Sequence, residues 1–265
     1  MPAPNEITIP QLNRLIGTPG CPVIVDICTD EDFAEDPRLI PTSIRHSHHD
    51  LKDLLSLVIG RSVVVACQKG KKLSQGVTSW LRSEGISAEY LHGGVQAWHD
   101  HDDTLSVPAA SIPDLADGAT LWVTRHRPKI DRIACPWLIR RFVDRNARFL
   151  YVAPSEVMSV ADRFGATAFD AEGASFHDRG DRCTFDVVLD HFQLRSAALI
   201  RLADVVRAAD LDNHASVPEA AGLHALSVGL SRQFKDDHSQ LEQGLLMYDA
   251  FYRWARDGFD EQHKG

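Results

Sequence analysis

The chain has 265 residues, of which 44% are hydrophobic and 25% charged, so it can bury two cores of ordinary size. Its formal net charge of −9 argues against bulk binding to nucleic acid or to an anionic membrane surface. No apolar run approaches the roughly 18 residues of a membrane-spanning helix. The start MPAPNEITIP lacks the basic and apolar regions of a signal peptide, so we expect a cytoplasmic protein with free thiols.

The segment VVVACQKGKKLSQG is the most informative part of the first half. Residues 63–66 are apolar and suit a buried strand of a parallel sheet, and helical spacing resumes at Val77 after a six-residue turn that starts at Cys67. Cys67 is therefore expected beside a helix N-terminus, where backbone N–H groups and nearby cations favour a thiolate. The cations of this turn are Lys69, Lys71 and Lys72. The alternative is a buried structural cysteine.

Four segments of the first half resemble a rhodanese domain in their order and spacing. They are IVDICTDEDF, LIPTSIR, the Cys67 loop and LHGGVQAW, and the resemblance covers about the first 105 residues. It implies an α/β domain with a parallel sheet and flanking helices. It also implies a six-residue active-site loop, CQKGKK, in which Cys67 carries sulfane sulfur as a persulfide. The related phosphatase branch has a longer loop, so the loop length favours a rhodanese-type sulfurtransferase.

In this interpretation an anionic sulfur donor binds to the loop that follows Cys67, and a thiophilic acceptor removes the sulfur. The candidate binding residues are Gln68, Lys69, Gly70, Lys71 and Lys72. No cofactor is required for this transfer. The rhodanese family usually shows Asp-x-Arg at the end of its early strand, whereas this chain has Asp26, Ile27 and Cys28. The function of that arginine is therefore missing here or supplied by another residue.

A boundary follows Trp98, where the chain becomes rich in Asp, Ala and Pro and loses its periodicity. We predict a rhodanese-like domain at residues 1–106, a linker at 107–118 and a second domain at 119–265. The second domain should be α+β and should end in several helices, because apolar residues recur at helical spacing in three segments near its end.

A basic loop follows the strand-like segment ATLWVT of the second domain. It leads into a segment with Cys135 and Pro136, where Pro136 suits the first position of a helix. A basic loop before a helix N-terminus is a potential site for an oxyanion such as chromate or sulfate. The candidate residues are Arg125, Lys129 and Arg132. The alternative is a solvated loop that pairs with nearby acids such as Asp131.

The last predicted helix carries His238, Glu242 and Asp249 on one face. With His177 and Asp186 from the preceding segment, His238 and Glu242 could bind a divalent transition metal such as Zn, Mn or Fe. The alternative is that Asp237 and His238 cap the helix, while Glu242 and Asp249 form salt bridges with Arg253 and other arginines.

The second half also resembles the C-terminal domain of ChrB-type chromate-resistance proteins over most of residues 119–257. The segments that carry this resemblance are RPKIDRIACPWLIRRFVD, FDAEG, HDRGDRCTFD and DDHSQLEQGLLMYDAFYRW. It implies an association with bacterial chromate resistance. We therefore predict a cytoplasmic sulfurtransferase linked to chromate resistance. The alternative is a non-catalytic chromate or redox sensor that acts as a regulatory binding protein.

Overall fold

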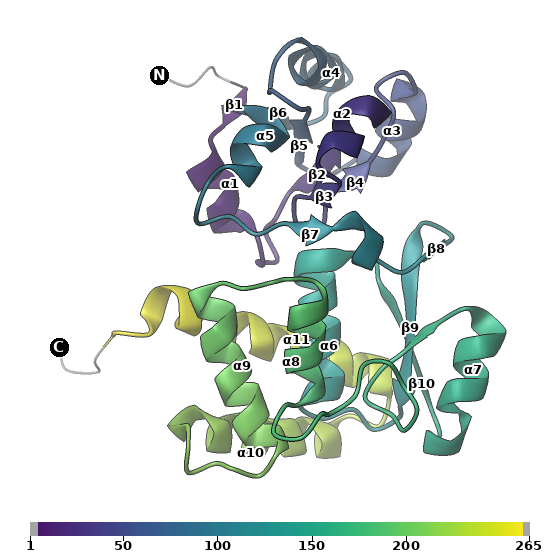
Figure 1. Ribbon diagram of the computed structural model, residues 1–265, viewed down its shortest axis with the longest axis vertical. Helices are drawn as coiled ribbons and strands as arrows, with labels where there is room; N and C mark the ends of the chain where they lie inside the picture. The colour runs from purple at the N-terminus through teal and green to yellow at the C-terminus, as the bar shows by residue number, and fades with distance from the viewer. Residues whose placement is uncertain (1–4, 262–265) are drawn as a thin grey trace. The chain divides into compact units, whose positions relative to one another are not determined.

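Residues 5–261 are described by the computed structural model, and they belong to two compact units (Figure 1). The first unit takes the chain up to Ala110 together with Arg141–Val143. The second takes Ser111–Arg140 and the chain from Asp144 onward. Within the described range, no helix is both long enough and apolar enough to cross a membrane.

The segment predicted as a linker, residues 107–118, carries short regular elements. They are β7 (Val107–Pro108), the 3-10 turn η1 (Ala109–Ser111) and β8 (Leu115–Ala116). β7 pairs with β3 (Arg38–Leu39) of the first unit, and β8 pairs with β9 (Ala119–Arg125) of the second. The two ends of this segment are therefore built into different sheets.

A five-stranded parallel sheet forms the centre of the first unit (Figure 1). In spatial order its strands are β1 (Glu6–Ile7), β6 (Ala88–Leu91), β5 (Val63–Ala66), β2 (Val23–Asp26) and β4 (Ile44–Arg45). Every pairing in this sheet is parallel. The middle strand β5 is buried along its whole length, as expected for an apolar run in a parallel sheet covered on both faces.

Five helices accompany this sheet: α1 (Ile9–Leu15), α2 (Asp30–Glu35), α3 (Leu51–Val58), α4 (Lys72–Ser83) and α5 (Gly94–His99). Side chains of α3 and α4 pack with Val63 and Val65 of β5 in one apolar cluster, through Leu54 and Val58 on α3 and Val77 and Leu81 on α4. Residue Val64 between them faces the opposite side of the sheet, because side chains alternate along a strand. The predicted α/β fold of this part is confirmed.

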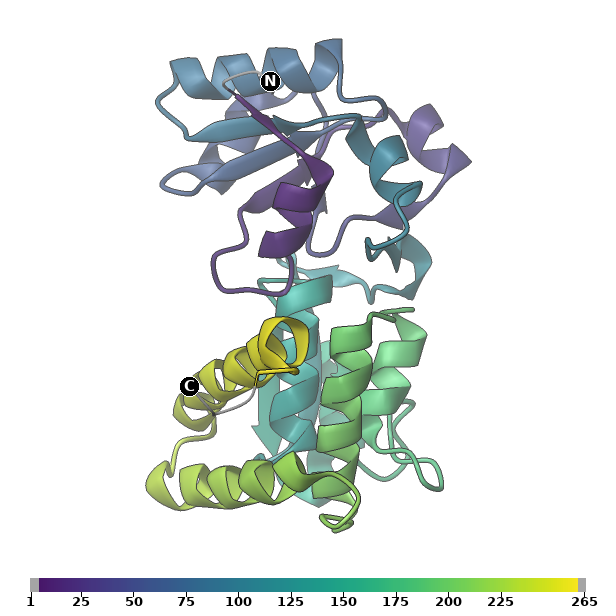
Figure 2. The same ribbon diagram turned by 90° about the vertical axis from the view of Figure 1, so that its left-hand side faces the viewer.

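The second unit combines a small sheet with a group of helices (Figure 2). β9 lies between β10 (Arg148–Val152) and β11 (Thr167–Ala168) and is parallel to both, while β8 pairs antiparallel to β9. The helices are α6 (Asp131–Leu138), α7 (Val157–Phe164), α8 (Thr184–His191), α9 (Ala197–Asp210), α10 (Pro218–Gln233) and α11 (Asp237–Arg253). The 3-10 turn η3 (Pro154–Glu156) precedes α7, and α11 continues as the π-helical turn η4 (Trp254–Gly258). α6 continues as the π-helical turn η2 (Ile139–Val143), whose last three residues are assigned to the first unit. The predicted α+β fold with several helices at its end is confirmed.

Pro136 lies inside α6 and not at its first position, so the predicted start of this helix was wrong. The helix already begins at Asp131. Proline has no N–H to donate to the carbonyl four residues earlier, which is that of Arg132. The hydroxyl of Tyr151 donates to this carbonyl instead, at 3.4 Å, so the helix continues through the proline without leaving that oxygen unpaired.

Candidate functional site

Cys67 directly follows β5, at the carboxyl end of the middle strand of the parallel sheet. Cys67 is only 5% exposed to solvent. The chain then makes a short turn and enters α4 at Lys72, as the sequence pattern predicted. Ligand sites of open parallel sheets lie at the carboxyl ends of their strands, so the position of Cys67 is that of a site residue.

Two glycines shape the turn after Cys67. Gly70 has φ +64°, and a Cβ there would lie 2.4 Å from the carbonyl oxygen of Leu91. Gly94, at the start of α5, has φ +69°, and a Cβ there would lie 2.1 Å from the carbonyl oxygen of Cys67. The loop and the start of α5 are thus in direct backbone contact, which only glycine permits.

Backbone hydrogen bonds fix this contact. The amide of Val95 donates to the carbonyl of Cys67 at 3.0 Å, and the amide of Gln96 donates to the carbonyl of Gln68 at 3.0 Å. These bonds turn the loop carbonyls toward α5. They leave the amides on the other side of the loop free to bind a ligand.

Within residues 5–261, no acceptor is bound to several amides of the loop and of the first turn of α4. These are the backbone N–H groups of Gln68, Lys69, Lys71, Lys72 and Leu73. Lys71, the residue before the helix, provides no side-chain cap. Unpaired amides at a helix start attract negative charge, so the loop next to Cys67 is suited to an anion or a persulfide.

Ser74 contacts the candidate nucleophile, and sequence reasoning did not select it. Its hydroxyl lies 3.2 Å from Sγ of Cys67 and 3.2 Å from the carbonyl oxygen of Lys71, to which it can donate. Ser74 is fully buried on the first turn of α4. When Cys67 is a thiolate, this hydroxyl can rotate and donate to the sulfur. The signal in the sequence was a hydroxyl residue one turn into the helix that follows the loop.

The predicted binding residues of the loop lie in different surroundings. Lys69, Lys71 and Lys72 are exposed, and they form no ion pair with any described residue. The side-chain amide of Gln68 instead donates to Glu35 at 3.0 Å. The lysines are therefore available to an anion, whereas the Gln68 side chain is already bound to a carboxylate.

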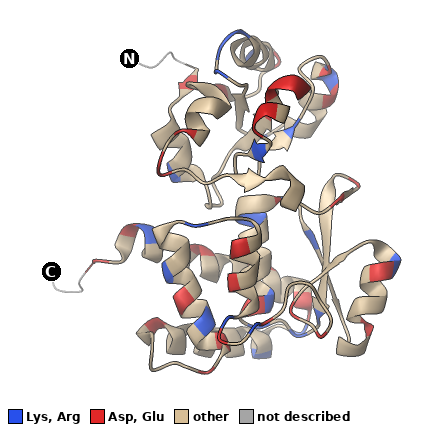
Figure 3. Cartoon of the chain, viewed as in Figure 1, with Lys and Arg blue, Asp and Glu red and all other residues tan. Residues whose placement is uncertain are grey.

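A cavity of about 380 Å³ adjoins the loop, and it is lined by Gln68 and Lys69, by Val95 and His99 of α5, and by Cys28. The remaining lining is largely acidic: Asp32, Glu35, Asp36 and Asp100 join Phe33 and Gln96. Helix α2 contributes much of this charge, which stands out in Figure 3. A small anion would therefore approach Cys67 from the lysine side of the loop.

Arg45 brings a positive charge to Asp26, whereas Cys28 stands at the position where the rhodanese pattern has an arginine. Asp26 is 2% exposed and accepts a hydrogen bond from the amide of Cys28 at 2.9 Å. Its other oxygen lies 3.7 Å from the guanidinium of Arg45, which comes from β4. Arg45 also pairs with Asp30 at 2.6 Å. A cation thus reaches the buried carboxylate from a neighbouring strand.

Cys28 is a poor second nucleophile. It is buried, and burial raises the pKa of its thiol well above the usual range, with the Asp26 carboxylate adding to the shift. A thiol that stays protonated does not attack a disulfide or a sulfur donor. Cys67 is therefore the only one of these two cysteines whose surroundings favour reaction.

Arg45→Met is expected to lower the free energy of unfolding of the first unit by about 1–3 kcal/mol, because it leaves the Asp26 carboxylate buried without a cation. Urea unfolding of the full chain measures the loss. The double variant Asp26→Asn with Arg45→Met should recover most of it, since asparagine can still accept from the amide of Cys28. A double variant as unstable as Arg45→Met alone would contradict this role for Arg45.

The basic loop of the second unit does not form a free cationic site. The guanidinium of Arg125 pairs with the carboxylate of Asp170 at 2.9 Å and donates to its carbonyl at 2.8 Å. Arg132 lies 3.4 Å from the same carboxylate. Lys129 is exposed. The structure thus brings two of the three predicted residues together, but on an acid of the chain, which agrees with the alternative that the loop pairs with nearby acids.

A family model described as "ChrB, C-terminal domain" matches residues 122–255, which is half of the chain. The chain belongs to the ChrB C-terminal domain family. Protein ChrB of Cupriavidus metallidurans is 36% identical over 132 residues, which are 49% of this chain and 39% of that protein. The chain thus spans well under half of the length of this curated relative.

Solved structures similar to the N-terminal part include a rhodanese-like domain protein from Staphylococcus aureus, with 31% identity and a TM-score of 0.31. The match covers 36% of this chain and 90% of that one. A rhodanese-related protein from Thermoplasma volcanium has 18% identity and a TM-score of 0.34, and the match covers 39% of this chain and 97% of that one. A protein from Rhodopseudomonas palustris, described as a possible tyrosine phosphatase, has 20% identity and a TM-score of 0.31. That match covers 36% of this chain and 80% of the other.

Four acidic residues of the ChrB C-terminal domain form a cluster: Asp131, Asp170, Asp178 and Asp210. Arg125 and Arg132 both lie beside Asp170 of this cluster. Carboxylate oxygens of Asp131, Asp170 and Asp178 lie within 4.8 Å of one another. Burial raises the pKa of Asp131 well above its ordinary value, and Asp210 and Asp170 add to this shift. Burial, together with Asp170 and Asp178, raises the pKa of Asp210 to about 6, although Arg132 acts in the opposite direction.

Asp210→Asn is expected to stabilise the protein at pH 8 and to do so less at pH 5. The folded-state pKa of Asp210, about 6, lies above its ordinary value of 3.8. The folded protein therefore takes up a proton before the unfolded chain does, and the cost of the buried charge is relieved as pH falls through 6. The stability difference between variant and parent should shrink by roughly 1 kcal/mol from pH 8 to pH 5. Thermal or urea unfolding at both pH values tests this, and a difference that stays constant or grows toward pH 5 would contradict it.

The four predicted metal ligands do not form a group in the structure. His177 contacts the carbonyl of Ala174 at 2.6 Å, and Asp186 pairs with Arg207 at 2.7 Å. His238 contacts the carbonyl of Phe149 at 2.9 Å. Glu242 pairs with Arg140 at 2.7 Å. Each predicted ligand is thus engaged elsewhere, and the alternative of a salt bridge with an arginine describes Glu242 correctly.

The third residue of the predicted helical face, Asp249, accepts a hydrogen bond from the indole of Trp137 at 2.8 Å. Asp249 follows His238 by 11 residues, which is about 16 Å along a helix, so a shared face cannot give them a shared metal. The cap of α11 is Asp236, which accepts from the amide of Ser239.

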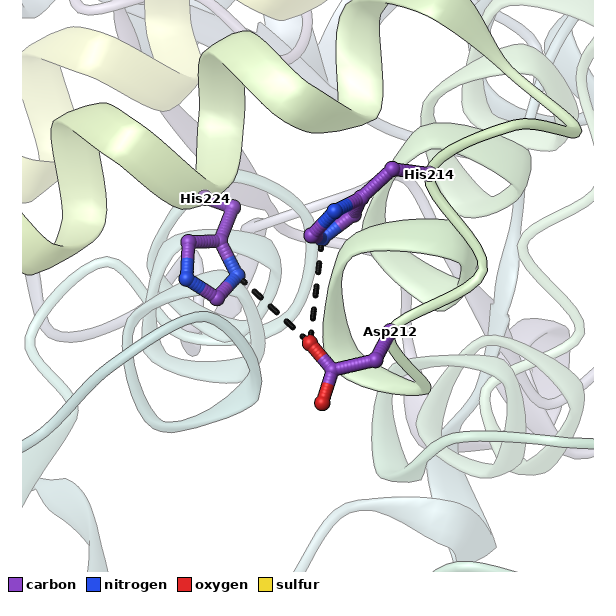
Figure 4. A group of neighbouring side chains, drawn as sticks. All are labelled: Asp212, His214 and His224. Carbon is purple, nitrogen blue, oxygen red and sulfur yellow. Dashed lines mark ion pairs between the residues drawn. The ribbon is translucent and has the colours of Figure 1, made fainter.

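Among the described residues, two other groups bring three potential metal ligands together. One is the acidic group Asp131, Asp170 and Asp178, and the other is Asp212, His214 and His224 (Figure 4). Sequence reasoning selected neither group. The second has a weak signal in the sequence, an Asp-x-His directly after a helix with another histidine ten residues later.

Proposed function

We propose that this chain is a rhodanese-type sulfurtransferase in which Cys67 carries sulfane sulfur as a persulfide. The observation that carries the proposal is the combination at Cys67: a buried thiol at the carboxyl end of β5, unpaired loop amides beside it and a buried hydroxyl at 3.2 Å. The resemblance of the surrounding segments to rhodanese domains supports the same activity.

In the first step, the thiolate of Cys67 attacks the outer sulfur of thiosulfate. A sulfur–sulfur bond forms on Cys67, the sulfur–sulfur bond of thiosulfate breaks, and sulfite leaves with the bonding electron pair. In the second step, a thiophilic acceptor such as cyanide attacks the terminal sulfur of the persulfide. Thiocyanate leaves, and the thiolate of Cys67 is restored.

The roles of the loop follow from its charges. The persulfide and the leaving sulfite are anions, and the unpaired amides of the loop can donate to either. Lys69 and Lys71 supply positive charge at the entrance. The hydroxyl of Ser74 can donate to the sulfur of Cys67 whenever that sulfur is negatively charged, which stabilises it as attacking and as leaving group.

We further propose that the sulfurtransferase acts in bacterial chromate resistance, since half of the chain belongs to the ChrB C-terminal domain family. The resemblance to chromate-resistance proteins supports this link. Chromate or sulfate remains a proposed small-molecule partner. Reducing compartments keep cysteine thiols free, and Cys67 must be a free thiol to accept sulfur, so the cytoplasmic location expected from the sequence belongs to the same proposal.

A regulatory sensor is the second candidate function. The acidic lining of the cavity that adjoins Gln68 and Lys69 favours it, because Asp32, Glu35 and Asp100 repel a dianionic donor such as thiosulfate. A sensor would use Cys67 to detect an oxidant and would not turn over a sulfur donor.

A sulfur-transfer assay with the purified full chain separates the two functions. Thiosulfate and, in a second reaction, an organic persulfide are supplied with cyanide, and thiocyanate is measured. The sulfurtransferase is expected to produce thiocyanate in repeated turnovers from at least one donor, and to hydrolyse no p-nitrophenyl phosphate. Absence of thiocyanate with both donors would reject the enzyme and leave the sensor.

A further inference from the structure

The connection between α9 and α10 of the second unit holds three potential metal ligands close together (Figure 4). Asp212 and His214 come from the turn after α9, and His224 comes from α10. Figure 4 shows both imidazole rings directed toward the carboxylate of Asp212. One oxygen of Asp212 lies 3.8 Å from Nε2 of His214 and 3.8 Å from Nδ1 of His224.

These distances are too long for hydrogen bonds. Both nitrogens are shielded from solvent, and neither has a hydrogen-bond partner among residues 5–261. If either nitrogen carried a proton, that proton would be a buried donor without an acceptor. If both were unprotonated, two lone pairs would face a negatively charged oxygen. A cation placed among the three atoms removes this conflict, because each atom then donates a lone pair to it.

We propose that Asp212, His214 and His224 bind one divalent transition metal ion of the zinc class. Two imidazole nitrogens and one carboxylate oxygen are a ligand set that zinc accepts in proteins, with bonds of about 2.0–2.2 Å. In a tetrahedral site with such bonds, neighbouring ligand atoms are about 3.4 Å apart. The two separations of 3.8 Å approach that spacing, so small side-chain rotations would complete the site.

The backbone of this turn supports the arrangement. The amide of Asn213 donates to the carbonyl of Ala208 at 2.9 Å, and the amide of Ser216 donates to the carbonyl of Asn213 at 3.1 Å. Asp212 takes φ +53°, in the left-handed region. Pro218 starts α10 and fixes its first turn. Two ligands therefore come from a hydrogen-bonded turn and the third from a helix, so little ordering is required on binding.

The exposure of these three side chains leaves the fourth coordination position of a tetrahedral metal open to solvent. The Asp212 side chain is 81% exposed, whereas those of His214 and His224 are 34% and 39% exposed. A metal ion could thus enter from solvent and keep a water ligand. No arginine or lysine is paired with any of the three residues in the described part of the chain. The group is distinct from the acidic cluster at Asp170, whose carboxylate is paired with arginines.

Zinc titration of the metal-free full chain against a chromophoric chelator tests the proposal. The parent should bind one more equivalent of Zn²⁺ than His224→Gln, or bind its tightest equivalent at least about tenfold more strongly. Loss of a residue that only hydrogen-bonds to a metal ligand already costs about tenfold in affinity, so loss of a ligand should cost at least as much. Asp212→Asn should show a loss of the same kind. His126→Gln, which removes an exposed histidine of the same unit outside the group, should bind zinc like the parent.

Cobalt provides a second readout of the same site. Co²⁺ bound in a tetrahedral site of nitrogen and oxygen ligands absorbs visible light, and this absorption should be present in the parent and in His126→Gln and lost in His224→Gln. Circular dichroism checks that every variant is folded. Equal zinc binding by the parent and His224→Gln, or a cobalt spectrum that His224→Gln leaves unchanged, would overturn the proposal.

Discussion

Cys67→Ser is expected to reduce sulfur transfer at least about 1,000-fold, because it removes the atom that forms the persulfide. A serine hydroxyl is not ionised near neutral pH and cannot carry sulfane sulfur. The fold should persist, since the change is nearly isosteric and Ser74 can still bond to the new hydroxyl. Thiocyanate formation by the variant and the parent, at equal protein concentration, measures the effect.

The matched control is Cys28→Ala, which removes the neighbouring cysteine that burial keeps protonated. This variant should keep its transfer rate within about threefold of the parent, because Cys28 has no chemical step in the mechanism. If Cys28→Ala lost as much activity as Cys67→Ser, the two cysteines would have to act as a pair, and the assignment of Cys67 alone would be wrong.

Gly94→Ala is expected to have the largest effect on the stability of the first unit. The new Cβ would lie 2.1 Å from the carbonyl oxygen of Cys67 and 2.4 Å from the amide of Gly70, both of them backbone atoms. The residue also has φ +69°, which alanine adopts only with strain. The loop must therefore move away from α5. We expect the free energy of unfolding to fall by more than about 3 kcal/mol, with sulfur transfer lost at the same time.

Gly85→Ala separates the clash from the backbone strain. Gly85 has φ +81°, but a Cβ there meets no atom within 4 Å. This control should cost only about 1–2 kcal/mol and leave transfer by Cys67 intact. Urea unfolding and the transfer assay on both variants give the comparison. Equal losses for the two variants would mean that the loop does not depend on its contact with α5.

The position of Cys67 could be predicted from sequence because every local signal pointed the same way. The apolar run of residues 63–66 has few alternatives to a buried strand, and helical spacing returns soon after the cysteine. The segment LHGGVQAW was part of the resemblance to a rhodanese domain, but only the structure shows that its Gly94 meets the Cys67 loop.

Contacts between segments distant in sequence could not be predicted in the same way. Arg45 lies 19 residues beyond Asp26, and the two meet because β4 is next to β2 in the sheet. The pairing of Arg125 with Asp170 likewise depends on the fold of the second unit. The helical face correctly placed His238 and Glu242 one turn apart, but it could not show that His238 contacts the carbonyl of Phe149 and that Glu242 pairs with Arg140. These partners come from other elements of the fold, so the predicted metal site does not form.

Mapping of the persulfide by mass spectrometry tests the central claim most directly. The reduced full chain is incubated with thiosulfate or an organic persulfide, the thiols and persulfides are trapped by alkylation, and the peptides of all five cysteines are compared. The proposed function predicts one added sulfur atom on the peptide that contains Cys67, and its loss when cyanide is added. Added sulfur on Cys28 or Cys183 with none on Cys67, or no added sulfur on any cysteine, would contradict it.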